Sequence, residues 1–87
     1  MTAGEKILSW GGDEDTVIFS DFSYDDALIG ITIDNRAVYE YSKMVEYLMV
    51  HEGFSEEEAV EWIDYNTIRA LPYGGENGPI IMYLEEE

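Results

Sequence analysis

Apolar positions recur at three- and four-residue spacing over residues 55–71, which predicts an amphipathic helix in the second half of the chain. The helix is expected to follow Ser55, because Ser55 and Glu58 have the spacing of a capping box. Its predicted core face consists of Ala59, Trp62, Ile63, Asn66 and Ala70. Glu57, Glu61 and Asp64 fall on another face, so the same helix is expected to carry an acidic stripe.

A second pattern of apolar residues predicts a helix just before this one, with a face made of Met44, Val45, Leu48 and Met49. Ser42 is its expected N-cap, and Gly53 is expected to end it in the left-handed conformation. Because only Gly53 and Phe54 separate the two helices, we expect a helical pair that shares one apolar core.

Apolar runs in the first half of the chain predict three strands. Residues 16–20 are β-branched and aromatic, and residues 27–33 place Ile29, Ile31 and Ile33 on one face. The turn-forming residues 34–36 then predict a hairpin in which residues 37–41 return antiparallel.

Residues 79–84 predict a final strand, which is apolar on both faces and is therefore expected inside the sheet. Residues 6–10 offer a short strand at most, and we expect residues 1–15 and 85–87 to be partly mobile. The predicted fold is a single α+β domain over residues 1–87, with the order β-β-β-α-α-β. In this fold two helices pack on one face of a small antiparallel β-sheet.

The composition adds one strong feature, a net charge of −16 from 20 acidic and 4 basic residues. The chain is also 46% hydrophobic and 14% aromatic, which favours a folded domain over a disordered acidic tail. An acidic surface repels nucleic acid and anionic membranes and attracts basic protein surfaces. The chain has no cysteine, no long apolar run and no N-terminal signal pattern, so we expect a cytoplasmic protein.

Two groups of residues invite a chemical reading. Asp21, Ser23 and Asp25 have the spacing of a calcium loop, but the sixth and twelfth positions lack its glycine and glutamate, and a solvated turn is the alternative. His51 lies near the predicted end of a helix, where interaction with the helix dipole explains it better than catalysis. No nucleophile, phosphate-binding or zinc motif occurs, so we expect a non-enzymatic protein without metal or cofactor.

Two polar residues interrupt the apolar pattern of the second helix. Asn66 is expected to bond a loop backbone or a strand edge, and Arg69 to pair with Asp64 or with carbonyl groups at the helix end. The alternative is a small polar pocket in which Arg69 holds an anionic ligand.

Tyrosine is abundant in this chain and is enriched in protein interfaces. Tyr24, Tyr39 and Tyr73 lie near predicted turns and are the candidates for contact with a partner. Tyr47 and Tyr83 are expected to pack in the core.

The segment 53–67, followed by residues 70–73 and 78–81, resembles a pattern of small uncharacterised phage and prophage proteins. The pattern consists of an acidic helix, Tyr-Asn, a glycine loop and a closing Pro-Ile-Ile strand, and it covers about residues 27–84. No activity is attached to it. In size and acidity the chain is also similar to anti-CRISPR proteins, some of which resemble DNA in charge and occupy the DNA-binding channel of a nuclease.

The leading hypothesis is a phage-type inhibitor whose carboxylates mimic nucleic acid and block a basic groove of a host protein, such as a CRISPR nuclease. Glu57, Glu61 and Asp64 would form the main binding stripe. A second patch would consist of Asp13, Glu14, Asp15, Asp21, Asp25 and Asp26. The rival hypothesis is a small structural or accessory domain whose acidity serves only solubility.

Overall fold

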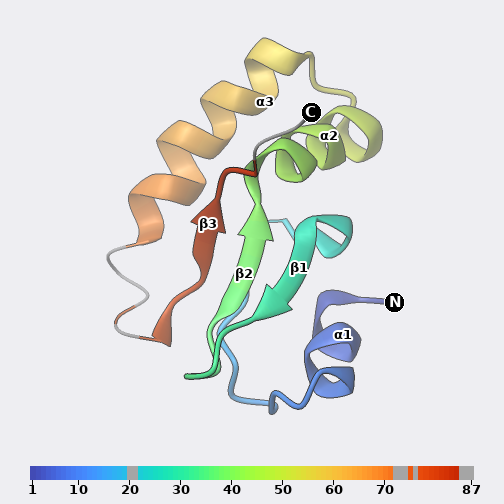
Figure 1. The fold of residues 1–87 in the computed structure, drawn as a ribbon. Helices are drawn as coiled ribbons and strands as arrows, with labels where there is room; N and C mark the ends of the chain where they lie inside the picture. The colour runs from blue at the N-terminus through green and yellow to red at the C-terminus, as the bar shows by residue number, and fades with distance from the viewer. Residues whose placement is uncertain (20–21, 72–74, 76, 85–87) are drawn as a thin grey trace.

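The computed structural model describes residues 1–19, 22–71, 75 and 77–84, which form a mixed α+β fold (Figure 1). Its helices are α1 (Ala3–Ser9), α2 (Tyr41–Glu52) and α3 (Glu56–Trp62), and its strands are β1 (Leu28–Ile31), β2 (Ala37–Glu40) and β3 (Ile80–Met82). A 3-10 turn, η1 (Asp25–Ala27), precedes β1, and a π-helical turn, η2 (Ile63–Ile68), continues α3. The predicted α+β class is confirmed, although the chain begins with a helix.

The sheet is mixed rather than antiparallel, with the order β1-β2-β3. The predicted hairpin is present, since β1 pairs antiparallel with β2. β3 instead pairs parallel with β2, through Val38 and Ile80, and lies at an edge of the sheet. The prediction of an interior antiparallel last strand was wrong, because the crossover through α2 and α3 returns the chain to the end of the sheet where β2 begins (Figure 1).

The N-terminal segment forms α1, so the prediction of a short strand over residues 6–10 was wrong. The partial mobility expected for residues 1–15 stays a prediction. Thr2 and Glu5 form a capping box at the start of α1. Ile7 is buried, and this helix therefore contributes to the core. The C-terminal residues 85–87, also expected to be mobile, lie outside the described residues.

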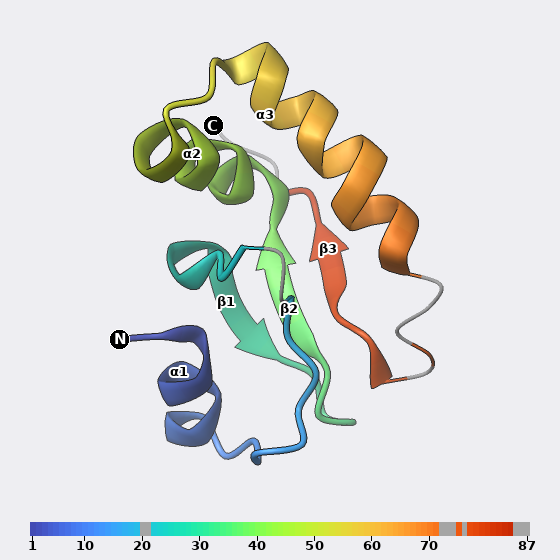
Figure 2. The same ribbon diagram turned by 180° about the vertical axis from the view of Figure 1, so that it is seen from behind.

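Residues 16–19 do not form the predicted strand. This segment crosses one side of the sheet in an irregular conformation (Figure 2), and Thr16 Oγ1 donates a hydrogen bond to Asn35 Oδ1 at 2.8 Å. The Phe19 ring lies 4.7 Å from that of Tyr39, which anchors the segment to the core. Side-chain contacts therefore hold a sequence with strand propensity outside the sheet.

The start of α2 differs from the prediction, whereas its end agrees. Glu40, not Ser42, is the N-cap, and its carboxylate accepts hydrogen bonds from the backbone N–H groups of Ser42 and Lys43. Met44 and Leu48 are fully buried. Gly53 ends α2 with a φ of 71°, in the left-handed region that favours glycine.

Helix α3 begins with the predicted capping box of Ser55 and Glu58. Its buried face consists of Ala59, Ile63 and Thr67, whereas Asn66 and Ala70, predicted to face the core, are exposed. The π turn explains the difference. A π turn closes its hydrogen bonds one residue later than an α turn, so the inward-facing position moves from Asn66 to Thr67.

An aromatic cluster fills the space between the sheet and α2. Tyr24 and Tyr39 are fully buried, and Tyr47 packs partly buried beside them, as predicted. Tyr83, predicted to lie in the core, is 72% exposed because it follows the end of the edge strand β3. Among the described residues, none of the helices is long and apolar enough to cross a membrane.

Candidate functional site

The acidic face of α3 is the best-formed surface predicted from the sequence. We define it as Glu57 and Glu61 of α3 together with Asp64 of η2, which continues the helix; all three are exposed. The capping box of Ser55 and Glu58 fixes the start of the helix, and burial of Ala59 and Ile63 fixes which side faces outward. The three carboxylates therefore project from one anchored element.

A hydrogen bond ties the end of the acidic face to the start of α2. The Tyr41 hydroxyl donates to Asp64 Oδ1 at 3.3 Å. Burial raises the pKa of Tyr41 to about 12, and the negative charge of Asp64 adds to this rise. Tyr41 therefore stays protonated at neutral pH and remains a donor to the Asp64 carboxylate.

The basic residues do not neutralise this surface. Lys6 Nζ donates to the backbone oxygens of Asp25 and Leu28, at 2.6 and 3.2 Å, and Arg36 Nε donates to Gly78 O at 2.9 Å. No lysine or arginine forms an ion pair with a carboxylate in the part of the chain that the structure describes. No described ion pair therefore competes with an external cation for the carboxylates of the acidic face.

The two polar residues inside the second helix serve the helix itself. Asn66 Nδ2 donates to Trp62 O at 3.1 Å rather than to a loop or a strand edge. Arg69 lies over the ring of Tyr65, with Cζ 5.1 Å from the centroid, instead of pairing with Asp64 or with carbonyl groups. Both side chains therefore use partners within one or two helical turns of their own position.

The predicted second patch does not behave as a unit. Asp13, Glu14 and Asp15 are exposed in the loop after α1, at the other end of the molecule from α2 and the start of α3 (Figures 1 and 2). Asp21 lies outside the described residues. Asp25 is used structurally, because its Oδ1 accepts the backbone N–H of Ala3 at 2.7 Å.

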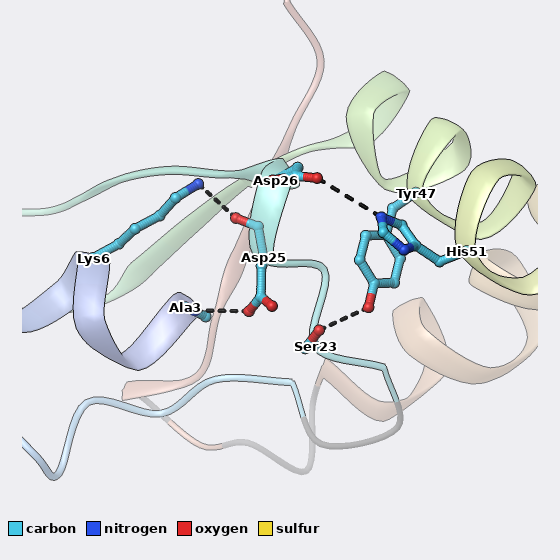
Figure 3. A network of polar contacts seen from close by, with 7 residues as sticks. All are labelled: Ala3, Lys6, Ser23, Asp25, Asp26, Tyr47 and His51. Atoms are coloured by element: carbon cyan, nitrogen blue, oxygen red, sulfur yellow. Dashed lines mark hydrogen bonds and ion pairs between the residues drawn. The ribbon is translucent and has the colours of Figure 1, made fainter. Parts of the chain in front are cut away.

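Asp26 belongs to a different group of side chains, at the side of α2 (Figure 3). Its Oδ2 is 3.8 Å from Nε2 of His51, and the His51 ring lies 4.4 Å from that of Tyr47. The Tyr47 hydroxyl shares a hydrogen bond of 2.8 Å with Ser23 Oγ. His51 lies in the last turn of α2, as the dipole interpretation requires, and it also faces a carboxylate.

The tyrosine candidates were wrong where the structure describes them. Tyr24 and Tyr39 are 0% exposed and cannot touch a partner in this conformation. Tyr24 lies at a left-handed turn position with a φ of 47°, and its hydroxyl is bonded to Thr67 Oγ1. Proximity to a turn therefore does not imply exposure when the turn folds back onto the core. Tyr73 lies outside the described residues.

Within residues 1–19, 22–71, 75 and 77–84, no three His, Asp or Glu side chains are placed to hold a metal ion. One feature of α3 escaped the sequence reading. Phe54, Trp62 and Tyr65 line a surface pocket together with Glu58, Glu61 and Asn66. The signal for it was the spacing of Glu58, Trp62 and Tyr65, which places acidic and aromatic groups along one side of the helix.

Comparisons with known proteins add no relative: no family model, no curated protein and no solved structure matches the chain. The resemblance to phage and anti-CRISPR proteins therefore stays a prediction, and the function has to be argued from the surface itself.

Proposed function

We propose that this chain is a non-enzymatic binding protein whose acidic face occupies a basic, nucleic-acid-binding surface of a host protein in the cytoplasm. The observation that carries the proposal is the acidic face itself: Glu57, Glu61 and Asp64 are exposed on one anchored helix and are not paired with any described lysine or arginine. Bringing such carboxylates to a basic groove speeds association and selects the partner by charge.

The density of charge along α3 supports mimicry of nucleic acid. At a rise of 1.5 Å per residue, the acidic face places three charges over about 10 Å. Glu56 and Glu58 lie on the same helix, so five carboxylates fall within roughly 12 Å of its axis. A single DNA strand carries one charge per roughly 3.4 Å of axis, which is close to this density.

The test compares two triple variants that each remove three negative charges. The first is Glu57→Gln, Glu61→Gln and Asp64→Asn on the acidic face, and the matched control is Asp13→Asn, Glu14→Gln and Asp15→Asn. Each tagged variant is used to capture proteins from a bacterial lysate. The expected captured protein is a nucleic-acid-binding protein, such as a CRISPR nuclease. The captured protein is then tested for binding to DNA in the presence of the untagged chain.

We expect the parent chain and the control to capture a basic protein and to displace DNA from it, whereas the α3 variant does neither. At about 0.5 M salt the screening length falls to roughly 4 Å, so capture should be lost. A captured protein that keeps its DNA when the chain is bound would refute mimicry.

A second candidate function is a structural or accessory domain whose acidity maintains solubility. The exposed carboxylates of Asp13, Glu14 and Asp15 favour it, because they lie in the loop after α1, at the other end of the molecule from the start of α3 (Figure 1), and continue the acidity there. Equal behaviour of the two triple variants in capture, with equal losses of solubility, would support this function over the first.

A further inference from the structure

The pocket beside α3 combines aromatic walls with an acidic rim. Its volume is about 330 Å³, and it is lined by Phe54, Glu58, Glu61, Trp62, Tyr65 and Asn66. Phe54 comes from the link between α2 and α3, and the other lining residues follow one side of α3 and η2. The pocket lies at the surface, since Tyr65 is 64% exposed.

The aromatic walls are held at an angle to one another. The rings of Phe54 and Trp62 have centroids 6.2 Å apart and planes inclined at 52°. Phe22 contacts both rings, with its centroid 5.4 Å from that of Trp62 and 6.4 Å from that of Phe54. These contacts fix two of the three walls before any ligand arrives.

The rim is negatively charged at neutral pH. Hydrogen bonds from the backbone and side chain of Ser55 lower the pKa of Glu58, and Glu61 is exposed to solvent. No lysine or arginine is among the residues that line the pocket. An aromatic face attracts cations through its quadrupole, so walls and rim act in the same direction.

The protein itself contains one contact between a cation and an aromatic ring, at the edge of the pocket. Arg69 lies over the ring of Tyr65, with its guanidinium carbon 5.1 Å from the ring centroid. An inorganic divalent cation is a poorer match for the pocket, because only two of its lining residues are carboxylates and three are aromatic. A neutral apolar ligand would leave the charged rim partly desolvated.

From these contacts we propose that the pocket formed by Phe54, Trp62, Tyr65, Glu58 and Glu61 binds an organic cation with an alkylated ammonium or guanidinium head. Such a head is supplied by a free small molecule or by a lysine, methyl-lysine or arginine side chain of a protein. This site goes beyond the proposed function, because it does not depend on mimicry of nucleic acid. Two residues of the acidic face, Glu57 and Asp64, do not line the pocket. Recognition of quaternary ammonium groups by aromatic cages uses the same physics.

The experiment follows the indole N–H signals of Trp62 and Trp10 by NMR while choline chloride is added at constant ionic strength. Trp10 lies at the end of α1, away from the pocket, and serves as the internal control. The neutral isostere 3,3-dimethylbutanol is added to a second sample. N-acetyl-trimethyllysine amide and N-acetyl-arginine amide form two further arms, which distinguish a free ammonium ligand from a side chain of a protein.

We expect choline to shift the Trp62 signal in a saturable way, without a matching shift of Trp10 and without an effect of the neutral isostere. Tyr65→Ala, at an exposed position, should weaken binding by about 2- to 30-fold, and Glu61→Gln should weaken it in the same direction. Tighter binding of either amino-acid amide than of choline would assign the pocket to a protein side chain.

Three results would overturn the proposal: equal shifts with the neutral isostere, equal shifts of both tryptophans, or unchanged affinity in both Tyr65→Ala and Glu61→Gln. Glu61 belongs to both surfaces. The choline titration of the parent chain and of Tyr65→Ala tests the pocket alone, and the capture experiment is judged by displacement of DNA. Failure of the cation site and failure of the acidic face can therefore be told apart.

Discussion

The carboxylate of Glu40 provides the sharpest test of the structure, because it starts a helix that the sequence assigns to a different cap. Glu40 is 2% exposed, and its two oxygens accept the N–H groups of Ser42 at 3.2 Å and Lys43 at 2.8 Å. Both bonds involve a charged acceptor at the positive end of the α2 dipole. Glu40→Ala removes both bonds and leaves a small cavity.

The loss of a cap costs about 0.5–2 kcal/mol, and the missing buried side-chain atoms add to this. We therefore expect Glu40→Ala to lower the free energy of unfolding by about 2–3 kcal/mol. A change of this size lowers the melting temperature by roughly 8–24 °C in a domain of this length. Urea denaturation followed by circular dichroism measures the free energy, and a thermal melt checks the shift.

Ser42→Ala is the matched control. Ser42 is exposed within the first turn of α2, and alanine has the higher helix propensity, so this change should be neutral or stabilise by up to about 0.5 kcal/mol. If Ser42→Ala destabilised the protein more than Glu40→Ala, the helix would begin at the cap that the sequence favours. The assignment of Glu40 would then be refuted.

Two further pairs of variants test packing near the chain start and on α3. Gly12→Ala should destabilise the protein by about 1–3 kcal/mol, because the new Cβ would lie 2.5 Å from Ile7 Cγ2. Gly4→Ala, in open space on α1, should stabilise it by roughly 0.5–1 kcal/mol. The opposite order of stability in urea denaturation would contradict this packing. Trp62→Ala should cost about 3 kcal/mol through lost contacts with Phe22 and Phe54. Trp62→Phe should cost much less, since Nε1 of Trp62 is buried without a hydrogen-bond partner in the described structure. Equal melting temperatures of Trp62→Ala and Trp62→Phe would contradict this packing of the Trp62 ring.

Two helix boundaries that local chemistry determines were predicted correctly. Gly53 ends α2 and Ser55 starts α3, because a left-handed glycine and a capping box act within a few residues. Thr2 and Glu5 have the same capping-box spacing, so the start of α1 could also have been predicted from the sequence. The role of Glu40 as the N-cap of α2 could not be predicted, because glutamate is not among the preferred caps and its role depends on burial at the end of β2.

The parts that depend on distant contacts could not be predicted. Residues 16–19 have the composition of a strand, yet Phe19 packs on Tyr39 and the segment stays outside the sheet. The direction of β3 depends on how two helices carry the chain across the sheet. Tyr24 and Tyr39 are buried for the same reason, since only the assembled core shows which side of a turn faces inward.

The π turn η2 connects these differences to the proposed sites. A regular α-helix would have kept Asn66 on the core face with Ile63, as the sequence pattern predicts. The additional residue in the turn buries Thr67 instead and leaves Asn66 outside, where it lines the pocket with Tyr65. Such turns are uncommon in helices and often occur at functional sites. The irregularity thus moves Asn66 from the predicted core face to the pocket beside Tyr65 and Glu61. Glu61 belongs to both the cation pocket and the acidic face, so the two lie side by side on one helix.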